Sequence, residues 1–303
     1  MAGSQATVLA IDHHHHAAPV HGVSSIRVLP DEDGTKNWDR IIVDERIKSR
    51  LLSHALLALA HQQEFYLLPG ALQRLVILTG PPGTGKTTLS TGLAEVVARE
   101  LAHKGSTCLA EVNPHALPSE MLGESQRNVA RLLDNSLPEL SLRYRHVIVV
   151  IDEVESFAVR RSAASFEANP VDVHRASDAV LEGMDRLMKR CPNVLVIATT
   201  NFPAAIDEAF TSRADMVLSL SIPDIETASK IIGISLEELS GIWPEIKALA
   251  GETPLHRQLA QRCVGWDGRQ LRRLPLKALS ESKELALHPE NLMADHLFAA
   301  TQD

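Results

Sequence analysis

The sequence of 303 residues has little cysteine and no long apolar run. Its three cysteines, Cys108, Cys191 and Cys263, are far apart and lack a C-x-x-C spacing, which indicates reduced thiols in a cytosolic compartment. A membrane-spanning helix needs about 20 consecutive apolar residues, whereas residues 51–60 form a shorter run that Ser53 interrupts. The first residues also lack the basic and then apolar layout of a signal peptide. We therefore expect a soluble, cytoplasmic protein without a membrane partner.

An excess of positive charge is also missing, because 30 lysines and arginines stand against 38 acids and give a net charge of −8. The sequence therefore offers no broad basic surface for a nucleic acid or an anionic membrane, and we expect no direct nucleic-acid partner. A narrow basic channel can still exist in an acidic protein, so a DNA-loading role stays open as an alternative. The length allows one large domain and a smaller one.

A phosphate-binding motif follows the first clear apolar run. Residues 74–79 predict a buried strand, residues 88–102 have helical spacing, and the pattern G-x-x-x-x-G-K-[ST] stands between them. Such a loop directs backbone N–H groups at a phosphate, at the positive end of the following helix. Lys86 can reach the β- and γ-phosphates, and Thr87 can offer a hydroxyl to Mg²⁺. We therefore expect a nucleoside triphosphate to bind at Gly80, Pro81, Pro82, Gly83, Thr84, Gly85, Lys86, Thr87 and Thr88.

Strands and helices then alternate, which is typical of an α/β protein with a parallel sheet covered on both faces. After about residue 222 the patterns are helical only. We expect a flexible arm over residues 1–36, an α/β domain over 37–222 and a small helical lid over 223–303. The arm contains the tract His13–His16, which we interpret as solvated rather than as a metal site, because ligands usually converge from spaced positions. The predicted strands are 74–79, 106–112, 147–151, 193–199 and 216–220, and the helices before the lid are 44–62, 88–102, 119–135 and 170–189.

Polar side chains follow two of the predicted strands at the edge where ligands bind in open α/β sheets. Asp152 and Glu153 come directly after residues 147–151. Asp152 would orient Mg²⁺ or its waters, and Glu153 would polarise the attacking water. Asn201 follows the strand 193–199 and could hold that water, although it could equally begin a turn before Phe202-Pro203.

Two arginines are further candidates for contact with the triphosphate. Arg213 stands between a predicted helix and the last strand, where it could enter the nucleotide site of a neighbouring subunit; a surface salt bridge is the alternative. Arg269 lies in the first turn of a lid helix. A cation there is mildly unfavourable for the helix itself, which favours a functional role toward the γ-phosphate.

These residues, in this order, resemble an AAA+ ATPase module. Four stretches, residues 38–52, 151–157, 205–215 and 268–275, look like the pachytene-checkpoint, thyroid-receptor-interacting branch, which consists of hexameric remodellers of HORMA-domain proteins. The resemblance covers about residues 37–300. It implies a homohexamer that binds ATP and Mg²⁺ at Lys86 and Thr87. It also implies Asp152 and Glu153 as the Walker B acids, Asn201 as sensor 1, Arg213 as the arginine finger and Arg269 as sensor 2.

The resemblance also implies how a client is handled. Met121, Leu122 and Gly123 fall in the first pore loop, where family members often carry an aromatic residue, and the second pore loop falls within residues 161–169. No folded adaptor-binding domain precedes Trp38, so the chain is similar to minimal bacterial forms of CBASS antiphage operons, which disassemble complexes of HORMA proteins with CD-NTases. We expect a negative regulator of such a system. The alternatives are a general chaperone or activase with another client, and an ATP-gated assembly switch without threading.

Overall fold

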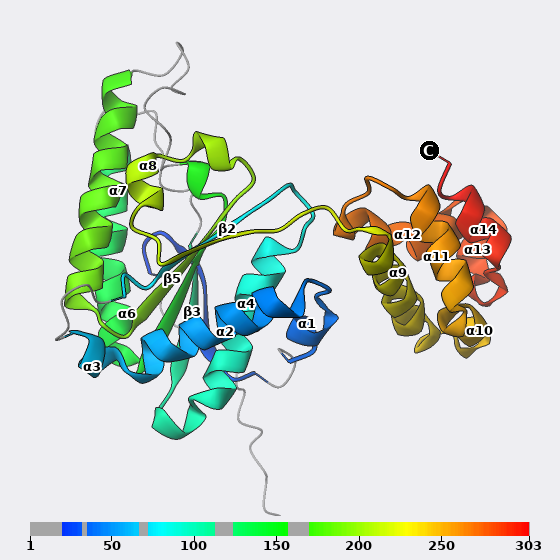
Figure 1. The fold of residues 1–303 in the computed structure, drawn as a ribbon, viewed down its shortest axis with the longest axis horizontal. Coiled ribbons are helices and arrows are strands. Elements are labelled where there is room, and N and C mark those ends of the chain that lie inside the picture. The colour runs from blue at the N-terminus through cyan, green and yellow to red at the C-terminus, as the bar shows by residue number, and fades with distance from the viewer. Residues whose placement is uncertain (1–19, 32–34, 67–71, 113–123, 157–169, 303) are drawn as a thin grey trace, which may run out of the picture.

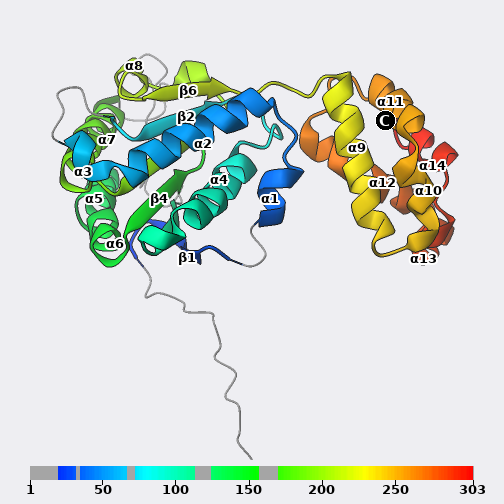
Figure 2. The same cartoon turned by 60° about the horizontal axis from the view of Figure 1, so that its bottom comes forward.

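The computed structural model describes residues 20–31, 35–66, 72–112, 124–156 and 170–302. Within these ranges the strands form one six-stranded sheet in the order β1-β3-β4-β5-β2-β6, seen from two directions in Figures 1 and 2. The pairs β3–β4, β4–β5, β5–β2 and β2–β6 are parallel, and β1 pairs with β3 in the antiparallel sense. The strands are β1 (Val23–Leu29), β2 (Leu75–Thr79), β3 (Thr107–Val112), β4 (His146–Ile151), β5 (Val194–Thr200) and β6 (Met216–Ser219).

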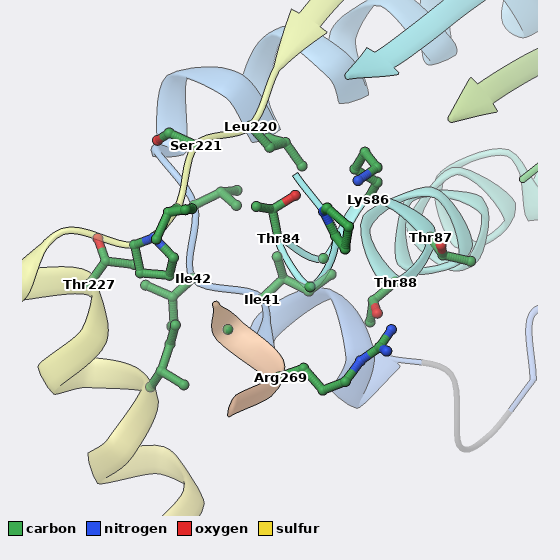
Figure 3. Close-up of a pocket in the computed structure, with 18 of the residues that line it drawn as sticks. Ile41, Ile42, Thr84, Lys86, Thr87, Thr88, Leu220, Ser221, Thr227 and Arg269 are labelled. Carbon is green, nitrogen blue, oxygen red and sulfur yellow. The ribbon is translucent and has the colours of Figure 1, made fainter. Parts of the chain in front are cut away.

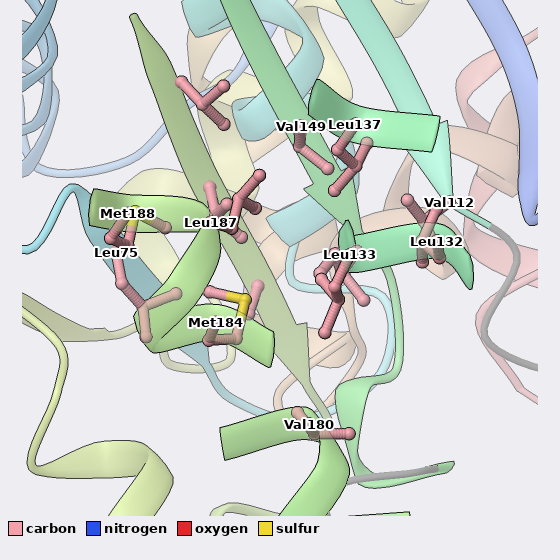
Figure 4. Close-up of a cluster of buried hydrophobic side chains, with 14 of the residues drawn as sticks. Leu75, Val112, Leu132, Leu133, Leu137, Val149, Val180, Met184, Leu187 and Met188 are labelled. Atoms are coloured by element: carbon pink, nitrogen blue, oxygen red, sulfur yellow. The ribbon is translucent and has the colours of Figure 1, made fainter. Parts of the chain in front are cut away.

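The three central strands are continuous apolar runs, because a sheet covered on both faces buries every side chain. All residues of β2, β4 and β5 are buried, as expected for strands of this kind. Successive side chains point to opposite faces: Leu75 and Ile77 enter one core, whereas Val76 and Leu78 enter the other. Figure 4 shows the first of these cores, where Leu75 lies beside Met188 of α7 and Val149 lies beside Leu137 of α6.

Helices cover both faces of the sheet (Figure 2). The helices α2 and α4 contribute side chains to one core, and α5, α6 and α7 contribute to the other. Asp44 caps α2 by accepting a hydrogen bond from the backbone N–H of Arg46 at 2.8 Å. These helices are α1 (Thr35–Arg40), α2 (Glu45–Ala60), α3 (Gln62–Tyr66), α4 (Lys86–Glu100), α5 (Glu124–Arg131), α6 (Leu137–Arg143), α7 (Pro170–Arg190) and α8 (Glu208–Thr211).

The C-terminal part of the chain is helical and has a core of its own, which includes Ile232, Leu259 and Leu271. Figure 1 shows this group of helices beside the sheet, joined to it by the segment between β6 and α9. The described chain therefore combines an α/β sheet unit with a helical C-terminal unit, and the predicted fold class is confirmed. The C-terminal helices are α9 (Ile225–Ser240), α10 (Lys247–Gly251), α11 (Thr253–Arg262), α12 (Gly268–Ser280), α13 (Lys283–Leu287) and α14 (Ala294–Ala299).

Two local differences from the sequence prediction have physical reasons. The expected arm over residues 1–36 contains β1, which pairs with the outer side of β3 from Leu29↔Thr107 to Ile26↔Ala110. This strand lies at the sheet edge and leaves several side chains partly exposed, so it has no clear apolar alternation. The helix expected over 119–135 instead runs on through a π-helical turn, Leu132–Ser136, into α6. Pro138 follows this turn and has no N–H for a regular i→i−4 bond.

His146, the first residue of β4, gives the fold a dependence on pH. The side chain is fully buried, with Nδ1 3.3 Å from the hydroxyl of Thr107 and Nε2 without a hydrogen-bond partner among the described residues. Burial, together with the charges of Arg145, Lys104 and His103, lowers the pKa of His146 to about 4. The unfolded chain, with a pKa near 6.5, therefore binds more protons between these two values, and stability falls as the pH falls through that window.

Between about pH 6.5 and 4, the free energy of unfolding of the parent should fall with pH, and that of His146→Leu should fall less. The difference between the two falls should be at most about 3 kcal/mol. Urea unfolding of the parent and the variant, measured at several values of pH, tests this. His61→Leu is the matched control, because it removes an exposed imidazole that is not among the groups acting on His146. A His146→Leu variant with the parent's slope contradicts the prediction.

Candidate nucleotide site

The loop between β2 and α4 has the backbone of a phosphate cradle. Gly85 is the N-cap of α4 in the left-handed region, with φ of 89°, and no side chain caps the first turn of the helix. The N–H groups of that turn are therefore left to a ligand. Gly83 also has a positive φ of 76°, and a Cβ atom there would lie 2.2 Å from Cγ of Asp267 in the C-terminal unit. Only glycine fits this close approach.

Lys86 projects from the first turn of α4 into a ring of oxygen acceptors. Its Nζ donates to the carbonyl oxygens of Gly80 at 2.8 Å and Pro81 at 2.9 Å, and to Oδ1 of Asn201 at 2.8 Å. The residue is only 6% exposed, and burial lowers the pKa of Lys86. The nearby carboxylates, of which Asp152 contributes most, raise this pKa but do not cancel the effect of burial.

The acids predicted from the sequence lie at the carboxyl end of β4, beside this lysine. The hydroxyl of Thr87 donates to the carboxylate of Asp152, with oxygen–oxygen distances of 3.0 and 3.1 Å. The amide Nδ2 of Asn201 donates to Oε1 of Glu153 at 3.1 Å. Asn201 therefore joins Lys86 to Glu153, so the structure brings the loop, both acids and the amide to one edge of the sheet.

Two residues of this network were not identified from the sequence. The hydroxyl of Thr199 donates to Asp152 and accepts the backbone N–H of Glu153 at 3.2 Å. Oε1 of Glu155 accepts the backbone N–H of Asn201 at 3.0 Å. Only the pairing of β4 with β5 brings these residues together, and nothing in the sequence alone gives that register. A polar residue in the last positions of an otherwise apolar strand is the signal that could have indicated Thr199.

A pocket of about 720 Å³ opens over this edge (Figure 3). Its volume is within the usual range for small-molecule and cofactor sites. Ile41 and Ile42, before α2, form one wall, and Leu220 and Ser221, after β6, form another. Ile41 packs in the core between the sheet and α2 and α4, whereas Ile42 packs against the core of the C-terminal helices. The pocket therefore lies where the two units of the chain meet.

The helix α12 closes the remaining side of the pocket. Asp267 caps this helix by accepting the backbone N–H groups of Arg269 and Gln270, both at 2.8 Å. Figure 3 shows the Arg269 side chain extending from α12 toward the side of the pocket that carries Thr88. The side chain of Arg272 donates to the backbone carbonyl of Arg40 at 2.8 Å. The lid helix is thus held against both the loop and the segment before α2.

Arg213 is not among the residues that line this pocket. It follows α8, and its guanidinium forms a paired contact with Asp185 of α7, with Nε–Oδ1 of 2.8 Å and Nη2–Oδ2 of 2.9 Å. The hydrogen bond from Arg213 holds the pKa of Asp185 below its usual value, so the pair stays ionised at neutral pH. The structure therefore contains the salt bridge that the sequence left open for Arg213, with a partner in the same chain.

Several predicted features lie outside the described residues. These are the tract His13–His16, the first pore loop with Met121, Leu122 and Gly123, and the second pore loop within 161–169. In the part of the chain that the structure describes, no group of three or more histidine, cysteine or acidic side chains is arranged to hold a metal ion. In the same described residues, no helix has the length and apolar character that a membrane span requires.

Comparison with known proteins identifies the family. The profile described as "ATPase family associated with various cellular activities (AAA)" matches residues 76–222. CD-NTase-associated protein 6 of Pseudomonas aeruginosa is 42% identical over 274 residues, which cover 90% of this chain and 88% of the relative. The chain belongs to the AAA ATPase family. This AAA ATPase is also 32% identical to the putative pachytene checkpoint protein 2 of Caenorhabditis elegans, over 89% of the chain and 68% of the relative.

Two solved structures resemble this AAA ATPase over most of its length. C. elegans PCH-2 matches with a TM-score of 0.74 and 27% identity, over 94% of this chain and 75% of the other. A chain of the E. coli MS115-1 HORMA:CdnC:Trip13 complex matches with a TM-score of 0.74 and 21% identity, over 93% of this chain and 95% of the other. This second match is a likeness in fold. The resemblance to the pachytene-checkpoint branch, predicted from the sequence, is confirmed, and so is the assignment as an ATPase.

We expect Asn201→Ala to lower kcat for ATP hydrolysis by about 10- to 100-fold, since it removes hydrogen bonds to two charged groups, Lys86 and Glu153. Steady-state kinetics on the purified protein tests this. Asn193, at the other end of β5, is the matched control. Its amide donates to the carbonyls of Ser141 and Tyr144, so Asn193→Ala should lower the unfolding temperature and leave kcat unchanged. Equal kcat in the two variants contradicts the prediction.

Proposed function

We propose that this AAA ATPase binds ATP with Mg²⁺ in the described pocket and hydrolyses it with the residues at the ends of β4 and β5. The single observation that carries this proposal is the network in which Asn201 contacts both Lys86 and Glu153, while Thr87 contacts Asp152. Lysine, hydroxyl and carboxylate groups arranged around a glycine-rich loop are the recurring parts of sites for phosphoryl transfer. The pocket volume and the uncapped start of α4 support the same conclusion.

Each residue then has a defined task. Lys86 exchanges its carbonyl acceptors for oxygens of the β- and γ-phosphates, and Glu153 polarises the attacking water while Asn201 holds that water in place. The hydroxyl of Thr87 and the carboxylate of Asp152 are the oxygen ligands that Mg²⁺ prefers, directly or through water. Mg²⁺, when bound with the triphosphate, neutralises charge on its oxygens. Arg269 reaches the γ-phosphate from the lid.

We further propose that the chain works as a homohexamer in the cytoplasm and that Arg213 acts on the site of the neighbouring subunit. Arg213 does not line its own pocket. Its contact with Asp185 leaves Nη1 to donate to the carbonyl of Ala209 at 2.6 Å, which gives the guanidinium a fixed direction. An arginine finger presents its guanidinium to the triphosphate of another site, so in this proposal Arg213 would exchange Asp185 for phosphate oxygens of the neighbouring subunit.

The proposed client is a HORMA-domain protein, alone or bound to a CD-NTase, and the proposed outcome is disassembly of that complex. The support is the 42% identity to a relative called CD-NTase-associated protein 6 and the structural likeness to a chain of a HORMA:CdnC:Trip13 complex. We propose that Met121, Leu122 and Gly123 grip the client in the axial pore. Removal of the HORMA protein would restrain the CD-NTase. The ATPase would therefore act as a negative regulator of a CBASS antiphage system.

We expect Glu153→Gln to bind ATP but to hydrolyse it at least about 100-fold more slowly, because it removes the group that activates the water. The same variant should keep a HORMA–CD-NTase complex intact and bound, whereas the parent should separate it in the presence of ATP. Turnover assays and size-exclusion chromatography measure the two effects. Glu182→Gln on α7 is the control and should behave like the parent. A parent that hydrolyses ATP and leaves the complex intact would contradict the proposed client.

We expect Arg213→Ala to lower turnover by about 10³-fold or more, and to be rescued by mixing with Lys86→Ala subunits. The first variant keeps an intact pocket and the second keeps Arg213, so neither is active alone but a mixed ring contains complete sites. Turnover measured against the mixing ratio checks this. Arg186 also lies on α7, where it forms a salt bridge to Asp134. Arg186→Ala is the control and should turn over like the parent. Mixed rings that assemble and remain inactive would rule out action across subunits.

A further inference from the structure

We infer that Thr199 is a positioning residue that fixes both acids of the ATPase site through one hydroxyl group. Thr199 occupies the last-but-one position of β5 and is completely buried. Its hydroxyl donates to the carboxylate of Asp152 and accepts the backbone N–H of Glu153 at 3.2 Å. The inference rests on the proposed roles of these two acids. Thr199 does not line the pocket, so it acts through them and not on the nucleotide.

The chemistry of the two contacts requires a hydroxyl at this position. An ionised carboxylate only accepts hydrogen bonds, and a backbone N–H only donates them. A hydroxyl is the one small side-chain group that donates one hydrogen bond and accepts another. Valine has the shape of threonine without either capacity, whereas serine keeps both. Thr199 is therefore distinguishable from a residue that only fills space in the sheet.

The backbone of Glu153 shows why its N–H needs this partner. Glu153 has a φ of 54°, in the left-handed region that residues other than glycine rarely adopt. Such a conformation persists only when the surrounding structure holds it. The bond from its N–H to Thr199 is one such restraint, and it sets the direction in which the chain leaves β4. Loss of the bond would let Glu153 relax and move its carboxylate away from Asn201.

The effect on Asp152 is separate. Its carboxylate accepts hydrogen bonds from Thr87, in the phosphate loop, and from Thr199, in the sheet. The bond to Thr199 ties the carboxylate to a rigid strand, so Thr87 and the metal meet it in a fixed orientation. Partners that orient a metal-binding carboxylate typically contribute about 10- to 100-fold in metal affinity or activity.

The neighbouring residue supplies a matched control. Thr200 is also completely buried, but its hydroxyl accepts the backbone N–H of Phe202 at 3.0 Å and, within the described residues, forms no hydrogen bond to either acid. Thr199→Val and Thr200→Val therefore remove the same hydroxyl at the same depth of burial. Only the first should disturb the acids.

The experiment compares Thr199→Val, Thr199→Ser and Thr200→Val in the full chain. We expect Thr199→Val to lower kcat by about 10- to 100-fold with little change in KM for ATP, as the loss of hydrogen bonds to charged groups predicts. A second readout is independent of turnover. The Mg²⁺ concentration that half-maximally enhances equilibrium binding of a fluorescent ADP analogue should rise about 10-fold. Thr199→Ser and Thr200→Val should remain close to the parent in both measurements.

Parent-like kcat and Mg²⁺ dependence in Thr199→Val would overturn the inference, and so would an equal loss in Thr200→Val. If Thr199→Val does not fold, Thr199→Cys replaces it, because a thiol of similar size is only a weak donor and acceptor; it must show the same rise in required Mg²⁺. The proposed function is tested by a different variant, so its failure can be told apart from the failure of this inference. A Glu153→Gln variant with normal turnover removes the roles of the acids, whereas an inactive Glu153→Gln beside a normal Thr199→Val removes only the role of Thr199.

Discussion

The burial of a lysine ammonium at the end of an apolar sheet is the constraint on which the site depends. Lys86 is almost entirely covered and burial lowers its pKa, so the charged form depends on the oxygen acceptors of its N–H groups and on the nearby carboxylates. Two acceptors come from the phosphate loop and the third is Asn201. Asn201 is in turn fixed by Glu155 and contacts Glu153. One desolvated charge thus draws β2, β4 and β5 into a common polar network.

The sheet provides this network with rigid support. Its central strands are buried on both faces, and the threonines of β2 and β5 occupy the last positions, where the parallel strands end together. The lid adds a second support, because Asp267 packs so close to Gly83 that no side chain fits between them. Loop, acids and lid helix are therefore positioned by separate cores but meet at one pocket.

Local patterns allowed much of the fold and the core of the site to be predicted. The phosphate loop, Asp152-Glu153 and the apolar strands are contiguous in sequence, so their periodicity and spacing are visible without a structure. The strand β1 was missed because an edge strand with partly exposed side chains carries little pattern. Thr199 and Glu155 were missed because their contacts depend on how β4 pairs with β5. For Arg213 two interpretations stayed open, because its partner Asp185 lies 28 positions away on α7.

The pair Ile41–Ile42 has a mechanical consequence for the lid. One isoleucine is anchored in the sheet core and the next in the lid core, and a second crossing runs from Leu220 to Asp224 between the same two bodies. Any movement of the C-terminal helices relative to the sheet must therefore bend or repack the chain at both places. Both places also line the pocket, so whatever fills the pocket contacts the two joints between the sheet unit and the C-terminal unit.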